Sequence, residues 1–272
     1  MQKVSRLHKI GLFFVATVFI STGCTAVKTA FSSLRSIEHF VALDTDQRIL
    51  YEPGAEDYAK AIEQHLSPAI IKVEKGQYRK FSKAVNIYAC KSHESFKALT
   101  GQKARATMTH RGIFFSPKLL ETPESLPLIL AHELSHLHIK QRIGTWKYSK
   151  LPFWFQEGLA TMISGGGGAE KVTIEAAKKK FISGKHFEPT EKGGILIRKT
   201  PSSWGLKPHM FYRQSMIFVD YIKTNNPDKF RMFLLELQEG KSFKNSFERT
   251  FEMSVGKTWA DFSRRIRMVG YP

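Results

Sequence analysis

The chain has 272 residues, of which 42% are hydrophobic and 24% are charged, a globular composition that excludes a disordered or fibrous protein. Two cysteines are too few for a disulfide scaffold or a cysteine-only zinc cluster, so ordinary packing must stabilise one sizeable domain or two small ones. The formal net charge of +18 favours anionic partners, but the lysines and arginines are spread along the chain and indicate a solvated basic surface.

The N-terminus has the pattern of a secretory signal peptide. Its first nine residues include three Lys or Arg and no acidic residue, and an uncharged apolar run follows from residue 10 to residue 20. This run is too short for a permanent membrane span, which needs about 20 apolar residues. We therefore expect residues 1–23 to be a signal peptide that exports the protein to the bacterial cell envelope.

Cys24 is the expected point of membrane attachment. It follows Ser-Thr-Gly in a stretch that resembles a bacterial lipobox, so we expect a lipid on Cys24 and a Ser/Thr-rich tether over residues 24–37. The alternative is a soluble exported protein that is cleaved near Ala26. Export in either form argues against nucleic acid as a natural partner.

The strands are expected early in the chain. After Pro53-Gly54, apolar residues recur at every fourth position, which predicts a helix that Pro68 interrupts or kinks. A turn is expected over residues 44–47. We predict strands over residues 39–43, 83–89 and 105–116, the last at a sheet edge, and a short helix over 92–99 that Ser92 caps and Gly101 ends.

From Glu124 onward, almost all of the patterns are helical. Strands followed by helices predict an α+β fold, with a small mixed N-terminal sheet packed on one long helix and a mostly helical C-terminal part. The Gly165–Gly168 run lacks the ending of a phosphate loop and is interpreted as a flexible hinge. The predicted helices cover residues 124–142, 153–163, 170–182, 209–224, 227–238, 242–252 and 257–267.

The first of these helices carries an HExxH motif at residues 132–136. His132 and His136 are four residues apart, so both imidazoles lie on one helix face and reach one metal ion. Glu133 falls about 60° from the nearer histidine, beside the metal but off its coordination axis. His138 points well away from this pair and is interpreted as a structural or surface residue.

A catalytic zinc site needs a third protein ligand and leaves the fourth position to water. The motif does not continue to a third histidine, because Ile139 and Arg142 stand at the positions of the longer zincin pattern. Glu157 lies 21 residues after His136, in a short helix rich in aromatic residues. An acid in such surroundings is costly to bury without a partner, and a metal ion supplies one.

The segments HELSH at 132–136 and LPFWFQEGLA at 151–160 resemble the gluzincins, the thermolysin-like zinc peptidases. They are more closely similar to the peptidase-MA-like domains of bacterial envelope proteins. The resemblance covers roughly residues 38–225, and we expect one peptidase domain over residues 38–270. It also implies that His132, His136 and Glu157 bind zinc and that Glu133 is the general base.

The resemblance extends to weaker elements of the site. It implies that a sheet-edge strand around Arg111, Gly112 and Ile113 binds the substrate backbone by strand addition. Tyr212, at the start of a later helix, would stabilise the oxyanion, and His209 is the alternative. Thr161 stands where thermolysin-like enzymes place an acid that orients a ligand, so the orientation of the two histidines is left open.

Together these residues predict a zinc-dependent endopeptidase or aminopeptidase-like hydrolase of the cell envelope, acting on a peptide or protein substrate with metal-activated water. The main alternative is a non-catalytic, metal-stabilised binding lipoprotein on a peptidase fold. Two others are a DNA-linked SprT-like protease, which uses a third histidine and is not exported, and a structural lipoprotein in which HExxH is accidental. The oligomeric state is not predicted.

Overall fold

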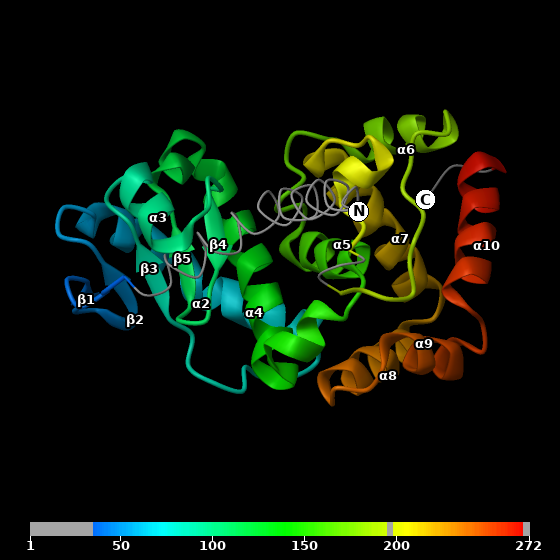
Figure 1. The fold of residues 1–272 in the computed structure, drawn as a ribbon, viewed down its shortest axis with the longest axis horizontal. Helices are drawn as coiled ribbons and strands as arrows, with labels where there is room; N and C mark the ends of the chain where they lie inside the picture. The colour runs from blue at the N-terminus through cyan, green and yellow to red at the C-terminus, as the bar shows by residue number, and fades with distance from the viewer. Residues whose placement is uncertain (1–34, 195–197, 269–272) are drawn as a thin grey trace, which may run out of the picture.

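The structure is a computed structural model, and it describes residues 35–194 and 198–268. The predicted signal peptide, Cys24 and most of the predicted tether lie outside the described residues. Within the described ranges, no helix is both long enough and apolar enough to cross a membrane. The predicted α+β fold is confirmed: the sheet lies at one end of the molecule, and the C-terminal part is mostly helical (Figure 1).

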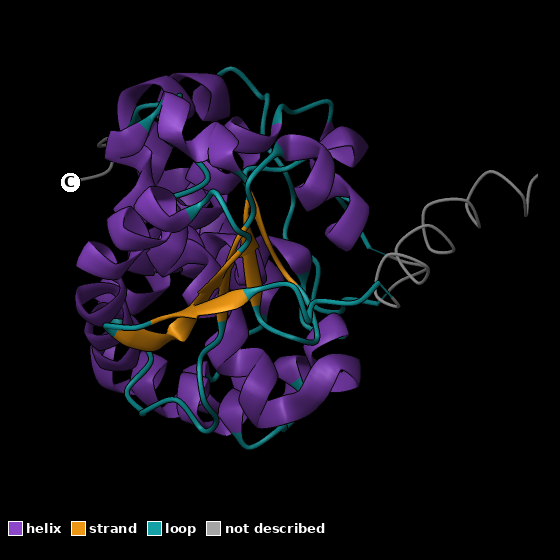
Figure 2. Cartoon of the chain, turned by 90° about the vertical axis from the view of Figure 1, so that its left-hand side faces the viewer, coloured by secondary structure: helices purple, strands orange, loops and turns teal. Residues whose placement is uncertain are grey.

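The sheet is mixed and five-stranded, in the order β1-β2-β3-β5-β4. The three central strands, β2, β3 and β5, are parallel, and the edge strands β1 and β4 are antiparallel to their neighbours. Helices lie on both sides of this sheet (Figure 2). The strands are β1 (Val41–Leu43), β2 (Asp46–Tyr51), β3 (Ile87–Ala89), β4 (Ala106–Met108) and β5 (Ile113–Phe115).

Alternation along the buried strands assigns a different helix to each face of the sheet. Ile87 pairs with Ile113, and both belong to the main core with α2 (Glu56–Gly76). Tyr88 pairs with Phe114, and both belong to a second core with α3 (His93–Thr100). Because successive side chains point to opposite faces, a sheet buried on both faces needs apolar residues at every position.

One expectation about the strands is wrong, and one strand was not expected. Residues 105–116 form a hairpin rather than one strand: β4 and β5 are antiparallel, and the Thr109 N–H donates to the Gly112 carbonyl at 2.8 Å across the turn. The segment around residues 44–47 holds a turn at Asp44-Thr45, but β2 starts directly after it. β2 was missed because its polar start, Asp46-Gln47-Arg48, has no strand pattern.

The helices agree closely with the expected ones. Helix α2 runs without interruption through Pro68. Ser92 caps α3 by accepting from the Ser95 N–H at 3.0 Å, and Gly101 ends it in the left-handed conformation, as predicted. The later helices are α4 (Leu126–Ser149), α5 (Phe153–Ser164), α6 (Ile174–Ile182), α7 (Pro208–Asn225), α8 (Pro227–Gln238), α9 (Phe243–Phe251) and α10 (Val255–Met268).

Helix α5 is the central helix of the helical part. It packs against both α4 and α7 and is buried along nearly its whole length. A Cβ atom at Gly158 would lie 2.6 Å from the Ser215 carbonyl oxygen of α7, so this position needs glycine. The close approach matters because α5 carries Glu157 and α7 carries Tyr212. Gly158, the residue after Glu157, thus permits the close approach of α5 and α7.

Candidate metal centre

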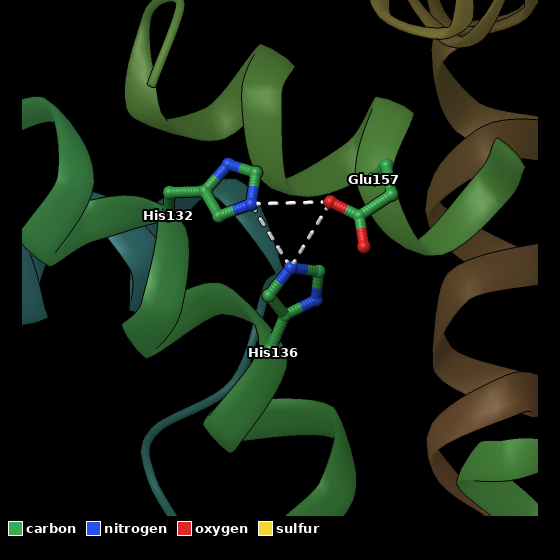
Figure 3. Close-up of side chains that lie close together, drawn as sticks. All are labelled: His132, His136 and Glu157. Atoms are coloured by element: carbon green, nitrogen blue, oxygen red, sulfur yellow. Dashed lines mark hydrogen bonds and ion pairs between the residues drawn. The ribbon is translucent and has the colours of Figure 1, made fainter. Parts of the chain in front are cut away.

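Helices α4 and α5 bring three potential metal ligands together, as Figure 3 shows. The Nε2 atoms of His132 and His136 are 3.0 Å apart. Glu157 Oε2 lies 3.3 Å from Nε2 of His132 and 3.6 Å from Nε2 of His136. The predicted grouping of these side chains is therefore observed, with Glu157 on a separate short helix as expected.

The triangle of donor atoms has the size that a zinc ion requires. Zn–N and Zn–O distances of about 2.0–2.1 Å in a tetrahedral site place neighbouring ligand atoms about 3.3 Å apart. The three observed separations, 3.0, 3.3 and 3.6 Å, lie around this value. Two imidazoles and one carboxylate also match the donor set of known catalytic zinc sites. The residues present thus fit a divalent metal ion.

The charges at the site favour a cation at its centre. Burial opposes a positive charge on His132, but the nearby carboxylates of Glu157 and Glu133 outweigh burial and raise the pKa of His132. Burial likewise opposes a negative charge on Glu157, but His136 and His132 outweigh it and hold the pKa of that carboxyl far below its usual range. The carboxylate is therefore ionised and able to act as a ligand at neutral pH.

Tyr148 orients one of the two histidines. Its hydroxyl oxygen lies 2.8 Å from Nδ1 of His136, on the side of the ring opposite the candidate ligand atom. For Nε2 to bind a metal as a neutral imidazole, Nδ1 must carry the hydrogen and donate it to Tyr148. Burial, followed by the charge of Glu157, raises the pKa of Tyr148, so the phenol stays neutral. This role of Tyr148 was not expected from the sequence.

The other histidine is held differently. Nδ1 of His132 is buried and makes no well-formed hydrogen bond to any described residue, although the backbone of Gly167 contributes to the raised pKa of this ring. Thr161 does not replace the missing acid, because its buried hydroxyl also lacks a hydrogen-bond partner within the described ranges. His132 is therefore positioned mainly by packing.

The Gly165–Gly168 run, interpreted from the sequence as a flexible hinge, is closely packed at Gly167 and Gly168. Gly167 is buried, and its N–H donates to Ser164 Oγ at 2.9 Å. A Cβ atom at Gly168 would lie 3.0 Å from Cε1 of His132 and 2.9 Å from the ring of Tyr212. The run is a tight turn packed against the candidate site.

Glu133 lies at the wall of a cavity of about 630 Å³ that also contains the three candidate ligands. Burial raises the pKa of Glu133, and the neighbouring histidines together with a hydrogen bond from the Met108 backbone partly oppose this rise. A carboxylate whose pKa is raised binds a proton more readily near neutral pH, which suits a general base. Met108 belongs to β4, so the edge strand borders the same cavity.

Tyr212 and His209 both line this cavity. The Tyr212 ring stacks on His132, with the ring centroids 6.0 Å apart. The charge of Glu157, followed by burial, raises the pKa of Tyr212, so its hydroxyl remains a hydrogen-bond donor. His209 Nδ1 lies 3.4 Å from Glu170 Oε2, at the rim.

The strand that was expected to bind the substrate backbone does not lie at the edge of the sheet. Ile113 lies in β5, which pairs with β3 on one side and β4 on the other, so its backbone has no free edge. Arg111 and Gly112 lie in the turn before β5 and line a separate hollow beside Lys140. The free edge that borders the cavity belongs instead to β4.

His138 points away from the candidate site, as predicted. It is fully buried, its Nε2 lies 2.8 Å from the Arg79 carbonyl oxygen, and its ring packs edge-on against Phe81. Burial lowers the pKa of His138 to about 4, so the ring is neutral. Cys90 is a buried free thiol within the second core.

No protein-family model matches the chain, and no curated protein is significantly similar to it in sequence. The fold and the site define an α+β protein with a buried His-His-Glu group that fits a divalent metal ion. The similarity to gluzincins rests on the HExxH motif, on Glu157 and on their arrangement.

Proposed function

We propose that the protein is a zinc-dependent peptide hydrolase of the gluzincin type. The observation that carries this proposal is the triangle formed by His132, His136 and Glu157, with Glu133 beside it on the wall of the same cavity. A purely structural zinc has no use for an acid next to its ligands. A hydrolase needs a carboxylate at this place, as the general base that accepts a proton from the attacking water.

A zinc ion held by the three ligands would supply Lewis acidity that polarises a peptide carbonyl and acidifies water near neutral pH. Glu133 removes the proton from the attacking water and delivers it to the leaving amine, which balances the hydrolysis. Its raised pKa supports both transfers. The neutral Tyr212 hydroxyl donates a hydrogen bond to the developing oxyanion, and His209 is the alternative donor.

The edge strand β4 supports an extended peptide substrate. Residues Ala106, Thr107 and Met108 line the cavity, and the side of β4 away from β5 carries no partner strand in the described sheet. A peptide that adds to this edge would run past Glu133 and the candidate metal ligands.

The Glu133→Gln variant tests the proposal. The amide cannot accept the proton, so we expect hydrolysis to fall about 10²–10⁴-fold while the bound zinc is retained. Zinc content is measured on the purified protein, and hydrolysis is measured with a quenched-fluorescent peptide library. Glu121→Gln, at an exposed acid outside the cavity, is the matched control.

Two results would contradict the mechanism or the function. Cleavage by Glu133→Gln at the wild-type rate would exclude Glu133 as the base. Stoichiometric zinc in a wild-type protein that cleaves no library peptide would favour the non-catalytic binding lipoprotein.

The place of action is proposed from the sequence alone. Residues 1–23 and Cys24 would export the hydrolase and attach it to an envelope membrane. Cell fractionation tests this: Cys24→Ala should move the protein from the membrane to the soluble exported fraction. Finding the wild type in the cytosol would refute it.

A further inference from the structure

Arg198 is a cationic residue in the wall of the metal cavity. It lies in the segment between α6 and α7, and it lines the cavity together with the three candidate ligands. Its guanidinium carbon lies 4.0 Å from the ring centroid of Phe153, in a cation–π contact. The Phe153 ring in turn stacks on Phe211 with the centroids 5.7 Å apart. An aromatic pair anchored in α5 and α7 thus supports the guanidinium.

This contact leaves the hydrogen-bonding edge of the guanidinium available. Stacking uses the flat face of the group, whereas the five N–H donors point outward in its plane. No carboxylate of the described residues lies within ion-pair distance of Arg198. By contrast, Arg105 in the same cavity wall is already paired with Glu170 at 3.0 Å.

The charge of Arg198 acts on the candidate site itself. Burial is the main cause that raises the pKa of Tyr148, and the charge of Glu157 is the main cause for Tyr212; the positive charge of Arg198 opposes both rises. Arg198 is therefore close enough to the two phenols for its charge to affect their pKa values. A substrate group that binds it would lie near the bond being cleaved.

We propose that Arg198 binds a carboxylate of the peptide substrate beside the scissile bond. This inference rests on the proposed function and names its substrate class: a peptide with an acidic side chain next to the cleaved bond, or with its C-terminal carboxylate there. The planar fork of arginine pairs with both oxygens of a carboxylate at once. Because Arg198 is solvent-exposed, the gain is near the lower end for a charged hydrogen bond, about tenfold in binding.

Two matched sets of short peptides separate the two sources of the carboxylate. In one set, a Glu is replaced by Gln next to each bond in turn. In the other set, the C-terminus is either a free carboxylate or an amide. For the zinc-loaded wild type, we expect kcat/KM to be about tenfold higher for the carboxylate member of one of the two sets.

Three variants test whether Arg198 is responsible. Arg198→Ala should reduce the carboxylate-to-amide ratio of kcat/KM to about one, whereas Arg198→Lys should keep part of it, because the charge remains but the fork is lost. Lys199→Ala is the matched control, since it removes a neighbouring exposed cation that does not line the cavity, and it should keep the wild-type ratio. Equal ratios in wild type and Arg198→Ala, or the same loss in Lys199→Ala, would overturn the proposal.

A binding measurement separates this inference from the proposed hydrolysis. In zinc-loaded Glu133→Gln protein, the Kd for each peptide pair is measured by calorimetry, with and without Arg198→Ala. If the wild type cleaves no peptide but Glu133→Gln binds carboxylates about tenfold better through Arg198, hydrolysis is refuted and the carboxylate site is supported. Identical Kd values for acid and amide refute the carboxylate site, whatever the activity.

Discussion

Replacing Glu157 by Gln tests the central feature of the site, the meeting of α4 and α5 around one cation. In the wild type, free zinc at 100 times its Kd should stabilise the folded state by about 2.7 kcal/mol. For a domain of this size, each kcal/mol raises the melting temperature by about 2–4 °C, so we expect zinc to raise it by about 5–11 °C.

The Gln variant should lose most of this zinc-dependent rise. Glu157 supplies the only anionic atom of the donor triangle, since both imidazoles bind in their neutral form. If its loss weakens the site a hundredfold, the same free zinc contributes only about 0.4 kcal/mol. Each protein is compared with itself, with and without zinc, so that the effect of the substitution on the metal-free fold cancels.

Differential scanning calorimetry at fixed free zinc measures both shifts, with Glu121→Gln as the exposed acid-to-amide control. An equal zinc-dependent rise in wild type and Glu157→Gln would refute the assignment of Glu157 as a ligand. No rise in the wild type would refute the metal site itself.

Two further predictions concern hydrogen bonds. Tyr148→Phe should raise the Kd for zinc about tenfold, because His136 loses the hydrogen-bond partner of its Nδ1. A competition titration measures the Kd, and an unchanged value in Tyr148→Phe would refute this role of Tyr148. Glu52 is buried, and its carboxylate accepts hydrogen bonds from the Lys91 N–H at 2.7 Å and from the Ser95 hydroxyl. Burial opposes the ionisation of Glu52, but these hydrogen bonds outweigh burial and lower its pKa. The ionised form therefore stabilises the fold above the unfolded-state pKa of 4.5, and this contribution is lost as the pH falls through the lower folded-state pKa. Glu52→Gln should lose about 1–3 kcal/mol of unfolding free energy at pH 7, and this loss should become smaller below pH 4.5. Urea titrations at several pH values measure the unfolding free energies of both proteins. A loss that does not change with pH would contradict the prediction.

The sequence predicted the parts of the site that depend on local periodicity. His132 and His136 share a helix face because any helix places residues four apart on one side. Glu157 was identified because an acid within a buried aromatic helix needs a partner, and the structure supplies both histidines. The α+β order could be predicted for the same reason, since the later helices show clear apolar spacings.

The parts that the sequence did not predict depend on contacts between distant segments. The hairpin of β4 and β5 has strands of only three residues each, too short for alternation to separate them from one long strand. Arg198 lies outside any regular element, and its place beside Phe153 depends on how α5 and α7 pack. Tyr148 follows His136 by twelve residues, and two side chains at that spacing on one straight helix are too far apart to touch.

A break in α4 at Gly144 explains how that spacing works. The residue has φ 76° and ψ 164°, far from helical values, in a conformation that side-chain-bearing residues rarely adopt. Without the break, twelve residues of helix would carry Tyr148 about 18 Å along the axis from His136. The chain instead folds back, so that the phenol reaches the imidazole. An insertion or deletion between Gly144 and Tyr148 should therefore separate the phenol from His136, although residues 145–147 do not line the cavity.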